Sequence, residues 1–329
     1  MIRSERRGWA IVVAGVLVAL VLSVLLGRYP SPGFTSPSTL IEDPLARRVL
    51  VERFPRVLGA FLTGAALGAS GATFQMVFRN PLVESGFLGV SQGAAFGAAL
   101  AILVVPGSVV AVQVGAALFA LMGLAASAGV ASRVRVGGWV LRLILAGIAV
   151  SAVYSAGTGV LKYLADPMDQ LPDITFWLLG GLWGMGWDDL GHIAPVVLVS
   201  LGVLVAMRWR LNLLALRDET AFSLGASLGR ERLILLVAAV LATAAVVAKT
   251  GLVGWVGLIV PHLARGLVGA DAQRALPASL LLGGTFCLLC DDLARVVLSG
   301  ELPLGIVTSL AGAGLFVVLM LRWRTRGGP

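Results

Sequence analysis

The stretch SGFLGVSQGAAFGAALAILVVPGSVVAVQVGAALFALMGLAASAGVAS, residues 85–132, contains no charged residue over 48 positions. A bilayer core of roughly 30 Å requires about 20 apolar residues per helix, so this stretch is long enough for two membrane-spanning helices and a tight turn. The whole 329-residue chain has the same character, with 58% hydrophobic and 13% charged residues. The sequence therefore predicts an all-α polytopic membrane protein.

Further charge-poor runs on both sides of this stretch predict ten spans. The N-terminal run is long enough to cross a membrane, so we expect a retained first helix rather than a cleaved signal peptide. The eighth span is the least regular because it is short and contains Pro261. The predicted spans are 8–27, 57–78, 86–105, 108–131, 141–161, 190–207, 233–249, 252–267, 275–297 and 303–321.

The distribution of Lys and Arg predicts the orientation, because cytoplasmic connections carry an excess of these residues. With the N-terminus in the cytoplasm, 17 of the 25 Lys and Arg residues fall on the cytoplasmic side. We expect one transmembrane domain over 1–329, both termini in the cytoplasm, periplasmic loops at 28–56 and 165–190, and a cytoplasmic loop at 208–232. Because the Arg residues gather at the ends of spans, the net charge of +8 does not indicate nucleic-acid binding.

Two local patterns indicate how the spans pack and where one loop lies. Glycines four residues apart let helix backbones approach closely, and we expect them to pack spans of one subunit together. The 165–190 loop is acidic at both ends and has an apolar centre that is too short to cross a bilayer. We expect a short helix there at the outer surface, with tryptophans at headgroup depth. The glycines are Gly64, Gly68, Gly89, Gly93 and Gly97, and the tryptophans are Trp177, Trp183 and Trp187.

The sequence predicts neither a catalytic site nor a metal site. It contains no G-x-x-x-x-G-K-[ST] phosphate loop and no H-E-x-x-H zinc motif. We interpret Cys287, Cys290, His192 and His262 as packing or interfacial residues. The middles of the predicted spans contain no Asp or Glu, which disfavours a carrier driven by an ion gradient.

One pair of charges falls within a predicted span. Asp291 precedes Arg295 by four residues, so a helix would place the two side chains as an ion pair. This pairing is a simpler explanation of the intramembrane charges than a coupling-ion site.

The stretch RWRLNLLALRDETAFSLGASLGRER, residues 208–232, is much longer than the 2–8 residues that usually connect two helices. Within it we expect a short helix, because acidic residues favour a helix N-terminus and a glycine favours its end. Apolar residues give this helix a surface that crossing the membrane does not require. It could bind a cytoplasmic partner or rest on lipid headgroups.

Several motifs, in order along nearly the whole chain, resemble the FecCD-type permeases of iron-chelate, haem and cobalamin uptake, which are type II ABC importers. The motifs are RFPR (53–56), GAALGASGATFQMVFRNPLVESGFLGVSQGAAFGA (64–98), LNLLALRDETAFSLGASLG (211–229), GLVGWVGLIVPHLARGLVG (251–269) and DDLARVVLSGELPLGIVTSLAGAGLF (291–316). One departure is Gly314, where the family often has Pro.

The resemblance implies a homodimeric permease of ten spans per subunit in a bacterial or archaeal cytoplasmic membrane. Two separate ATPase subunits would hydrolyse ATP, and a periplasmic binding protein would deliver the cargo. No cofactor is implied for this chain. Family positions for docking the binding protein match Arg53, Arg56 and Arg295. Family positions for coupling to the ATPase match Leu216, Arg217, Asp218, Glu219, Ala221, Phe222, Leu224 and Gly225. Family positions of the path and inner gate match Asn80, Pro81, Leu82, Ser151 and Ser155.

Two other functions stay open on the sequence. An ion-coupled secondary transporter is the main alternative, and the absence of carboxylates from the span centres disfavours it. A membrane-embedded enzyme would need a catalytic constellation that the sequence does not present. The cargo is undetermined, because ferric siderophores, haem, cobalamin and some oxyanions are carried by permeases that resemble this chain.

Overall fold

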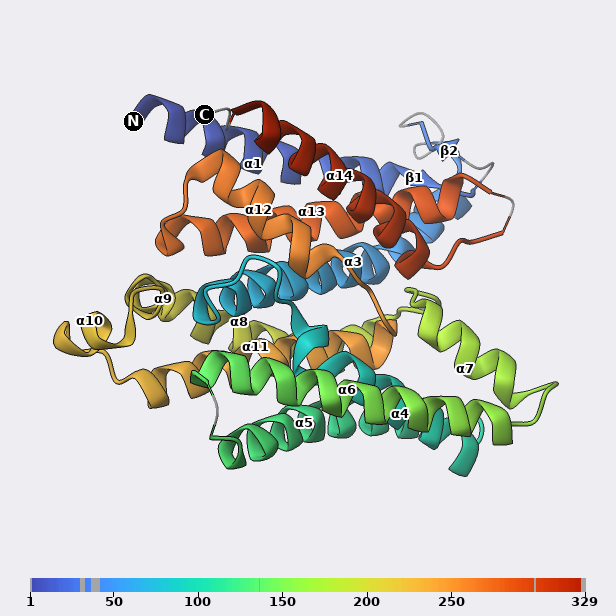
Figure 1. Ribbon diagram of the computed structural model, residues 1–329. Coiled ribbons are helices and arrows are strands. Elements are labelled where there is room, and N and C mark those ends of the chain that lie inside the picture. Colours follow the sequence, from blue (N-terminus) through green and yellow to red (C-terminus); the bar gives the residue numbers. More distant parts are fainter. Residues whose placement is uncertain (1, 30–32, 37–41, 136, 299, 327–329) are drawn as a thin grey trace.

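The chain folds almost entirely into helices that lie roughly side by side (Figure 1). The structure is a computed structural model that describes residues 2–29, 33–36, 42–135, 137–298 and 300–326. A short antiparallel pair, β1 (Leu26–Gly27) and β2 (Gly33–Phe34), follows the first helix, and a 3-10 turn, η1 (Ser85–Leu88), lies inside the bundle. The helices are α1 (Ile2–Leu25), α3 (Pro44–Val77), α4 (Val90–Val104), α5 (Val109–Arg133), α6 (Trp139–Leu164), α7 (Gln170–Leu179), α8 (Trp187–Ala206), α9 (Arg208–Leu214), α10 (Asp218–Ser223), α11 (Leu228–Thr250), α12 (Val256–Val268), α13 (Ala272–Val296) and α14 (Leu304–Arg326).

Ten of these helices coincide with the ten predicted spans, which confirms the all-α membrane class. In the described part of the chain, eight are long and apolar enough to cross a membrane. The other two, α4 and α12, have 15 and 13 residues and are shorter than a full crossing requires. The predicted outer segment 28–56 lies partly outside the described residues, and its last part belongs to α3, which begins at Pro44 behind an Asp43 cap.

The two short helices begin within the bundle because the backbone ahead of each takes a left-handed conformation. Gly89, with φ of +77°, separates η1 from α4 and lies against Gly123, about midway along α5. Trp255, with φ of +71°, precedes α12. Irregular backbone at membrane depth requires partners inside the protein. The Ser127 and Ser151 hydroxyls supply them for the η1 region by donating to the carbonyl oxygens of Leu88 and Gly86, at 3.0 and 3.1 Å.

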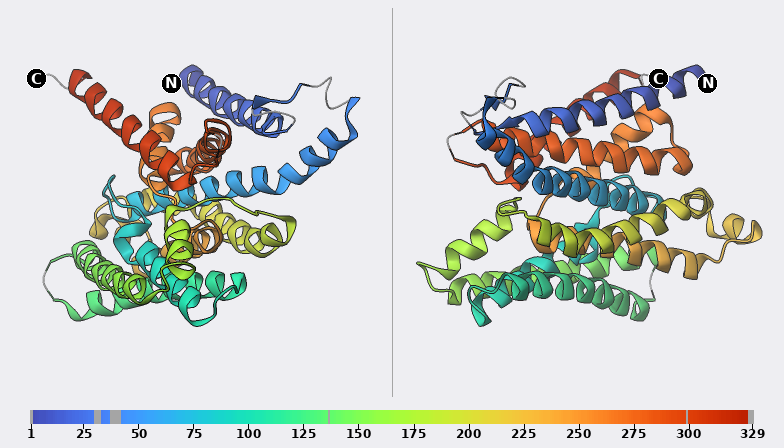
Figure 2. Two further views of the ribbon diagram at one scale, coloured as in Figure 1. Left: turned by 90° about the vertical axis from the view of Figure 1, so that its right-hand side faces the viewer. Right: turned by 180° about the vertical axis from the view of Figure 1, so that it is seen from behind.

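Helix α3 lies at the centre of the bundle. It passes between a group that contains α1, α12, α13 and α14 and a group that contains α4, α5, α6, α8 and α11 (Figures 1 and 2). Within its most apolar 18-residue window, 83% of the residues are buried. Within this window its side chains therefore mostly face protein, whereas α5 and α6 keep most of their surface outside the bundle.

Glycines bring α3 into backbone contact with α13. A Cβ atom on Gly64 would lie 2.0 Å from the carbonyl oxygen of Gly283, so no side chain fits between the helices there. Gly93 and Gly97 make an equally close approach to the backbone of α5. The predicted use of these glycines in packing within one subunit is confirmed.

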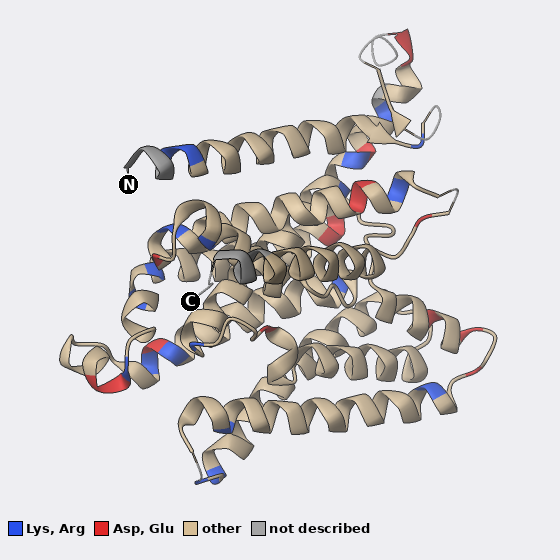
Figure 3. Cartoon of the chain, turned by 45° about the horizontal axis from the view of Figure 1, so that its top comes forward, with Lys and Arg blue, Asp and Glu red and all other residues tan. Residues whose placement is uncertain are grey.

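Charged residues gather at the two ends of the long helices (Figure 3). One end carries the start of α1, the end of α14 and α10, and we refer to it as the α10 end (Figure 1). The opposite end carries β1, β2 and α7, and we refer to it as the α7 end. The start of α1 and the end of α14 lie at the same end of the bundle, as an even number of spans requires.

Replacing Gly283 by Ala should destabilise the protein, because the added methyl group would lie about 2.1 Å from the Gly64 carbonyl oxygen and force the helices apart. Overpacking of this kind costs about 1–3 kcal/mol. Thermal unfolding of the detergent-solubilised protein, monitored by size-exclusion chromatography, measures the loss of stability. The matched control is Gly15→Ala in α1, where nothing lies within 4 Å of the added atom. Equal thermal stability of the two variants would contradict the packing role.

Candidate functional site

Residues 208–232 fold as α9, α10 and the first turn of α11, and α10 protrudes at its end of the bundle (Figure 1). The α10 helix ends in a Schellman motif, with hydrogen bonds from Ala226 N to Ala221 O at 3.0 Å and from Gly225 N to Phe222 O at 2.9 Å. Gly225 has φ of +81°, so the predicted helix end is confirmed. Helix α9 was not predicted, although its buried Leu211 and Leu214 have helical spacing.

The apolar side chains of α10 point away from the protein. Phe222 is 74% exposed and Leu224 is 57% exposed, and Leu216 just before the helix is also exposed. Ala221 is the one residue of α10 that is buried. Apolar surface of this kind at the end of a helix bundle is suited to binding a partner or a lipid surface.

The ionic contacts of α10 are made by Asp218. Its carboxylate forms a bidentate pair with Arg232, at 2.7 and 3.1 Å, and a further ion pair with Arg79. These guanidinium hydrogen bonds lower the pKa of Asp218 to about 2, so the carboxylate is ionised throughout the physiological range. The neighbouring Arg217 and Glu219 are exposed.

The predicted gate residues form a tight turn just after α3. Asn80 Oδ1 accepts a hydrogen bond from the Leu82 amide at 3.0 Å, which is an Asx turn, and Pro81 prevents the helix from continuing. Leu82 is 49% exposed. Beside the turn lies a cavity of about 210 Å³, and its lining residues include His262 and Arg265. The irregular backbone expected at this position is present.

At the α7 end, two of the three predicted docking arginines are engaged in pairs within the chain. Arg56 lies 2.9 Å from Asp291 and 3.0 Å from Glu301. The Arg295 side chain, 6% exposed, lies 3.0 Å from Asp291 and also pairs with Asp292. The predicted ion pair between Asp291 and Arg295 is thus confirmed, and it belongs to a larger buried network.

Arg53 differs from these two because it pairs with no carboxylate of the described residues. Its guanidinium donates weakly, at 3.4 Å, to the carbonyl oxygens of Val24 and Tyr29 and to the Thr35 hydroxyl. It lines a cavity of about 400 Å³ that also contains Arg28, Arg56, Arg295, Glu52 and Glu301. Of the three arginines, Arg53 is therefore the one that forms no ion pair with a described carboxylate.

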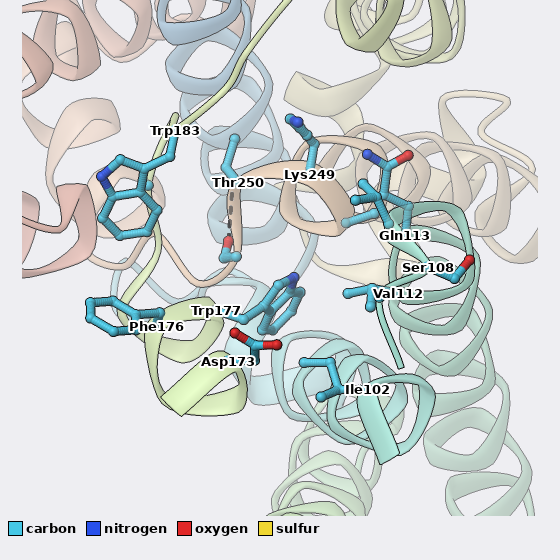
Figure 4. Close-up of a pocket in the computed structure, with 15 residues that line it drawn as sticks. Ile102, Ser108, Val112, Gln113, Asp173, Phe176, Trp177, Trp183, Lys249 and Thr250 are labelled. Atoms are coloured by element: carbon cyan, nitrogen blue, oxygen red, sulfur yellow. Dashed lines mark hydrogen bonds between the residues drawn. The ribbon is translucent and has the colours of Figure 1, made fainter. Parts of the chain in front are cut away.

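A second pocket at the α7 end, of about 290 Å³, is aromatic on one side and polar on the other (Figure 4). Phe176, Trp177 and Trp183 line it from the predicted outer-surface segment. Lys249, on its opposite side, pairs with Asp189 at 2.7 Å. The tryptophans were singled out in the sequence, but this ion pair was not, because its members are far apart in the chain.

The predicted path residues of α6 have different environments. Ser151 is used for the hydrogen bond to Gly86, whereas Ser155 is exposed. The same helix presents large apolar side chains, including Val153 at 71% and Leu145 at 55% exposed. Of these two serines, Ser155 is therefore the one whose side chain could line a path, because the Ser151 hydroxyl is already hydrogen-bonded.

The remaining polar candidates have packing contacts. Cys287 and Cys290 are free and buried. The His262 ring nitrogen Nδ1 lies 2.8 Å from the Leu258 carbonyl oxygen. Within the described ranges, no cluster of three His, Cys, Asp or Glu residues is arranged to hold a metal ion.

Comparisons with known proteins point to one family. The model of the FecCD transport family matches residues 15–322. The chain is 37% identical to the molybdate import system permease protein MolB of Haemophilus influenzae, over 95% of this chain and 94% of that protein. It is 40% identical to the hemin transport system permease protein HmuU of Yersinia pestis, over 94% of each chain. A solved inward-facing structure of an ABC transporter described as the metal-chelate type superposes with a TM-score of 0.86, at 36% identity, over 94% of this chain and 97% of that chain.

Replacing Asp291 by Asn should strongly destabilise the protein, because Arg56 and the buried Arg295 would lose a shared carboxylate. Removing one partner of a buried pair costs about 3–5 kcal/mol. The change would be measured as the apparent melting temperature in detergent. Glu301→Gln is the control, since Glu301 is more exposed, at 26%, and such pairs are worth about 0–1 kcal/mol. A melting temperature for Asp291→Asn equal to that of the control would show that the network does not hold this end together.

Proposed function

The chain belongs to the FecCD transport family, and on this premise we propose that it is the permease subunit of an ATP-driven importer of metal chelates. The cargo would be a ferric siderophore, haem or cobalamin, passed inward from a periplasmic binding protein. The chain itself would hydrolyse nothing, and a separate pair of ATPase subunits would supply the energy. Relatives named for hemin, ferric dicitrate and molybdate transport support the transport class and leave the cargo to be measured.

One observation carries this proposal beyond family membership: α10 presents Phe222 and Leu224 to the outside at the α10 end. A connection that served only to join α8 to α11 would need neither an extra helix nor exposed apolar side chains. Docking into a groove of an ATPase subunit would cover them. The ion pairs of Asp218 hold the helix in place, and Gly225 ends it.

The binding protein would dock at the α7 end. An arginine at a docking surface gives orientation and a faster encounter with an acidic partner more than raw affinity. Arg53 fits this role best, because it is partly exposed and forms no ion pair with a described carboxylate. Arg56 and Arg295 line the same cavity and stay paired to Asp291. They would add to the positive electrostatic potential that an acidic binding protein meets there.

The path would run between two copies of this chain. In a single chain, α6 and α14 leave large apolar side chains uncovered, among them Val153 at 71% and Leu310 at 73% exposed. Pairing two subunits along these helices would enclose a passage with Ser155 on its wall and the Asn80–Leu82 turn at its inner mouth. A wide passage whose wall has few polar groups would bind a bulky chelate only weakly, so the chelate would be released readily.

The proposed location is a bacterial or archaeal cytoplasmic membrane, with both termini in the cytoplasm. Support comes from the bias of Lys and Arg and from the position of the start of α1 and the end of α14 at the α10 end (Figure 1). Cytoplasmic ATPase subunits could reach α10 only in this orientation.

The ion-coupled alternative has one observation in its favour. Glu84, in the segment before η1, is half-buried beside Gly257 and forms no ion pair with a described residue. A carrier could use such a carboxylate to bind a proton or a cation. Uptake by the reconstituted chain alone, driven by a pH or sodium gradient, would support that alternative and overturn the importer proposal.

Replacing Phe222 by Ala should weaken binding of the ATPase subunits, because an exposed aromatic anchor would be lost. Anchors of this type contribute about 2 kcal/mol or more, which is roughly a 30-fold change in affinity. Affinity between the purified permease and its ATPase in detergent measures the change. Leu118→Ala on α5, where the side chain is also exposed, is the control. Unchanged ATPase affinity with Phe222→Ala would remove α10 from the docking surface.

Replacing Arg53 by Gln should slow association with the binding protein by about tenfold at low salt, because long-range attraction to an acidic surface would be reduced. The effect should shrink as salt rises, since screening weakens interactions of exposed charges. Surface plasmon resonance at several salt concentrations provides the rates. Arg48→Gln, an exposed position on the same helix, is the comparison. A rate that is independent of Arg53 at every salt concentration would place docking elsewhere.

A further inference from the structure

The α10 helix has few apolar contacts with the rest of the chain, so its ionic contacts decide what moves with it. It contains six residues, and Ala221 is the one that is buried. Most of its remaining surface faces outward. A displacement of α10 can be transmitted to the membrane-spanning helices only through the side-chain contacts that fix its position.

The Asp218 carboxylate makes two such connections at once. One is the bidentate pair with Arg232 at 2.7 and 3.1 Å, and the other is the ion pair with Arg79. Bidentate guanidinium–carboxylate pairs fix relative orientation as well as distance. Asp218 therefore sets the position of α10 relative to α11 and to the segment that follows α3.

Arg79 leads to the turn at the predicted gate. It lies two residues after Val77, the last residue of α3, has φ of +51° and precedes Asn80 in the chain. Its Nε donates to the Leu214 carbonyl oxygen at 3.1 Å, so one side chain ties α9, α10 and the turn together. A non-glycine residue in this conformation is held by its surroundings and is displaced when they move.

Arg232 leads to the start of α6. The Arg232 guanidinium, in a residue only 7% exposed, lies over the Trp139 ring at 4.3 Å from the centroid. Trp139 is the first residue of α6 and also packs on Phe78, with ring centroids 5.6 Å apart. The two routes from Asp218 therefore meet again where α3 ends and α6 begins.

We propose that Asp218 is a positioning residue that transmits movement of α10 to the Asn80–Leu82 turn and to the start of α6. This inference rests on the proposed docking of an ATPase at α10. Phe222 and Leu224 would hold the partner, and Asp218 would pass its displacement on. Binding and transmission are thereby assigned to different residues of one short helix.

Asp188 provides a control of the same charge. It lies in the first turn of α8, is exposed and forms no ion pair with a described residue. Any general effect of charge on the helix N-terminus should be similar for both positions. A difference between them then reports the contacts to Arg79 and Arg232.

The experiment uses the full complex of permease, ATPase and binding protein in proteoliposomes, with the cargo that the binding protein retains. The readout is cargo taken up per ATP hydrolysed, together with the amount of ATPase that co-purifies. Asp218→Asn should leave assembly intact and lower uptake per ATP by about tenfold, the effect of about 1.4 kcal/mol. Asp188→Asn should change neither quantity, and Asp218→Glu should restore part of the loss.

A second variant covers the case in which Asp218→Asn does not fold. Arg79→Gln removes the connection to the turn and leaves the pair between Asp218 and Arg232, so it should also lower uptake per ATP. A cysteine introduced by Leu82→Cys should change its rate of maleimide labelling on ATP addition, and should lose this response when combined with either variant.

Unchanged uptake per ATP in an assembled Asp218→Asn complex would overturn the transmission role and leave the docking proposal standing. The same result with Arg79→Gln would overturn the route to the turn. Failure of the unaltered permease to bind an ATPase would instead overturn the proposed function itself.

Discussion

The contact between the α3 and α13 backbones at Gly64 and Gly283 sets the geometry of the whole bundle. Lipid tails are as apolar as the side chains of a membrane helix, so burial of apolar surface does not by itself drive helices together inside a bilayer. Close backbone approach supplies the missing attraction through dispersion contacts. With α3 fixed against α13, its remaining faces are available to α11, α12 and α8, and the other helices are arranged around this centre.

Much of this arrangement could be predicted from the sequence. Apolar runs and the spacing of charges identified ten helices, and the glycines at intervals of four indicated which faces pack. The break between η1 and α4 could not be predicted in the same way, because Gly89 stands in an uninterrupted apolar run and its positive φ has no hydropathy signal. The helical start of α3 at Pro44 was missed for the opposite reason: its first turns are charged and resemble a loop.

The candidate sites divide along a similar line. Local chemistry was readable: a short helix that starts with acidic residues and ends at Gly225, and an ion pair at spacing four between Asp291 and Arg295. Partners that come from distant segments were not readable. No pattern in the sequence around Arg56 predicts its pairing with Asp291, and none around Asp218 predicts its pairing with Arg79. The sequence therefore identified residues of interest, whereas the fold decides which of them form internal ion pairs and which, like Arg53, pair with no described carboxylate.

The uninterrupted course of α3 has a mechanical consequence. From Arg56 to Val77 it is continuous helix without a further proline, which corresponds to a rod of about 33 Å. Its two tips lie next to the two surfaces at which other proteins are proposed to bind. A hydrogen-bonded helix resists bending as well as stretching. A tilt of one end of α3 would therefore move the other end directly. Docking of the binding protein on one side of the membrane and the nucleotide state of the ATPase subunits on the other would then be mechanically coupled through α3.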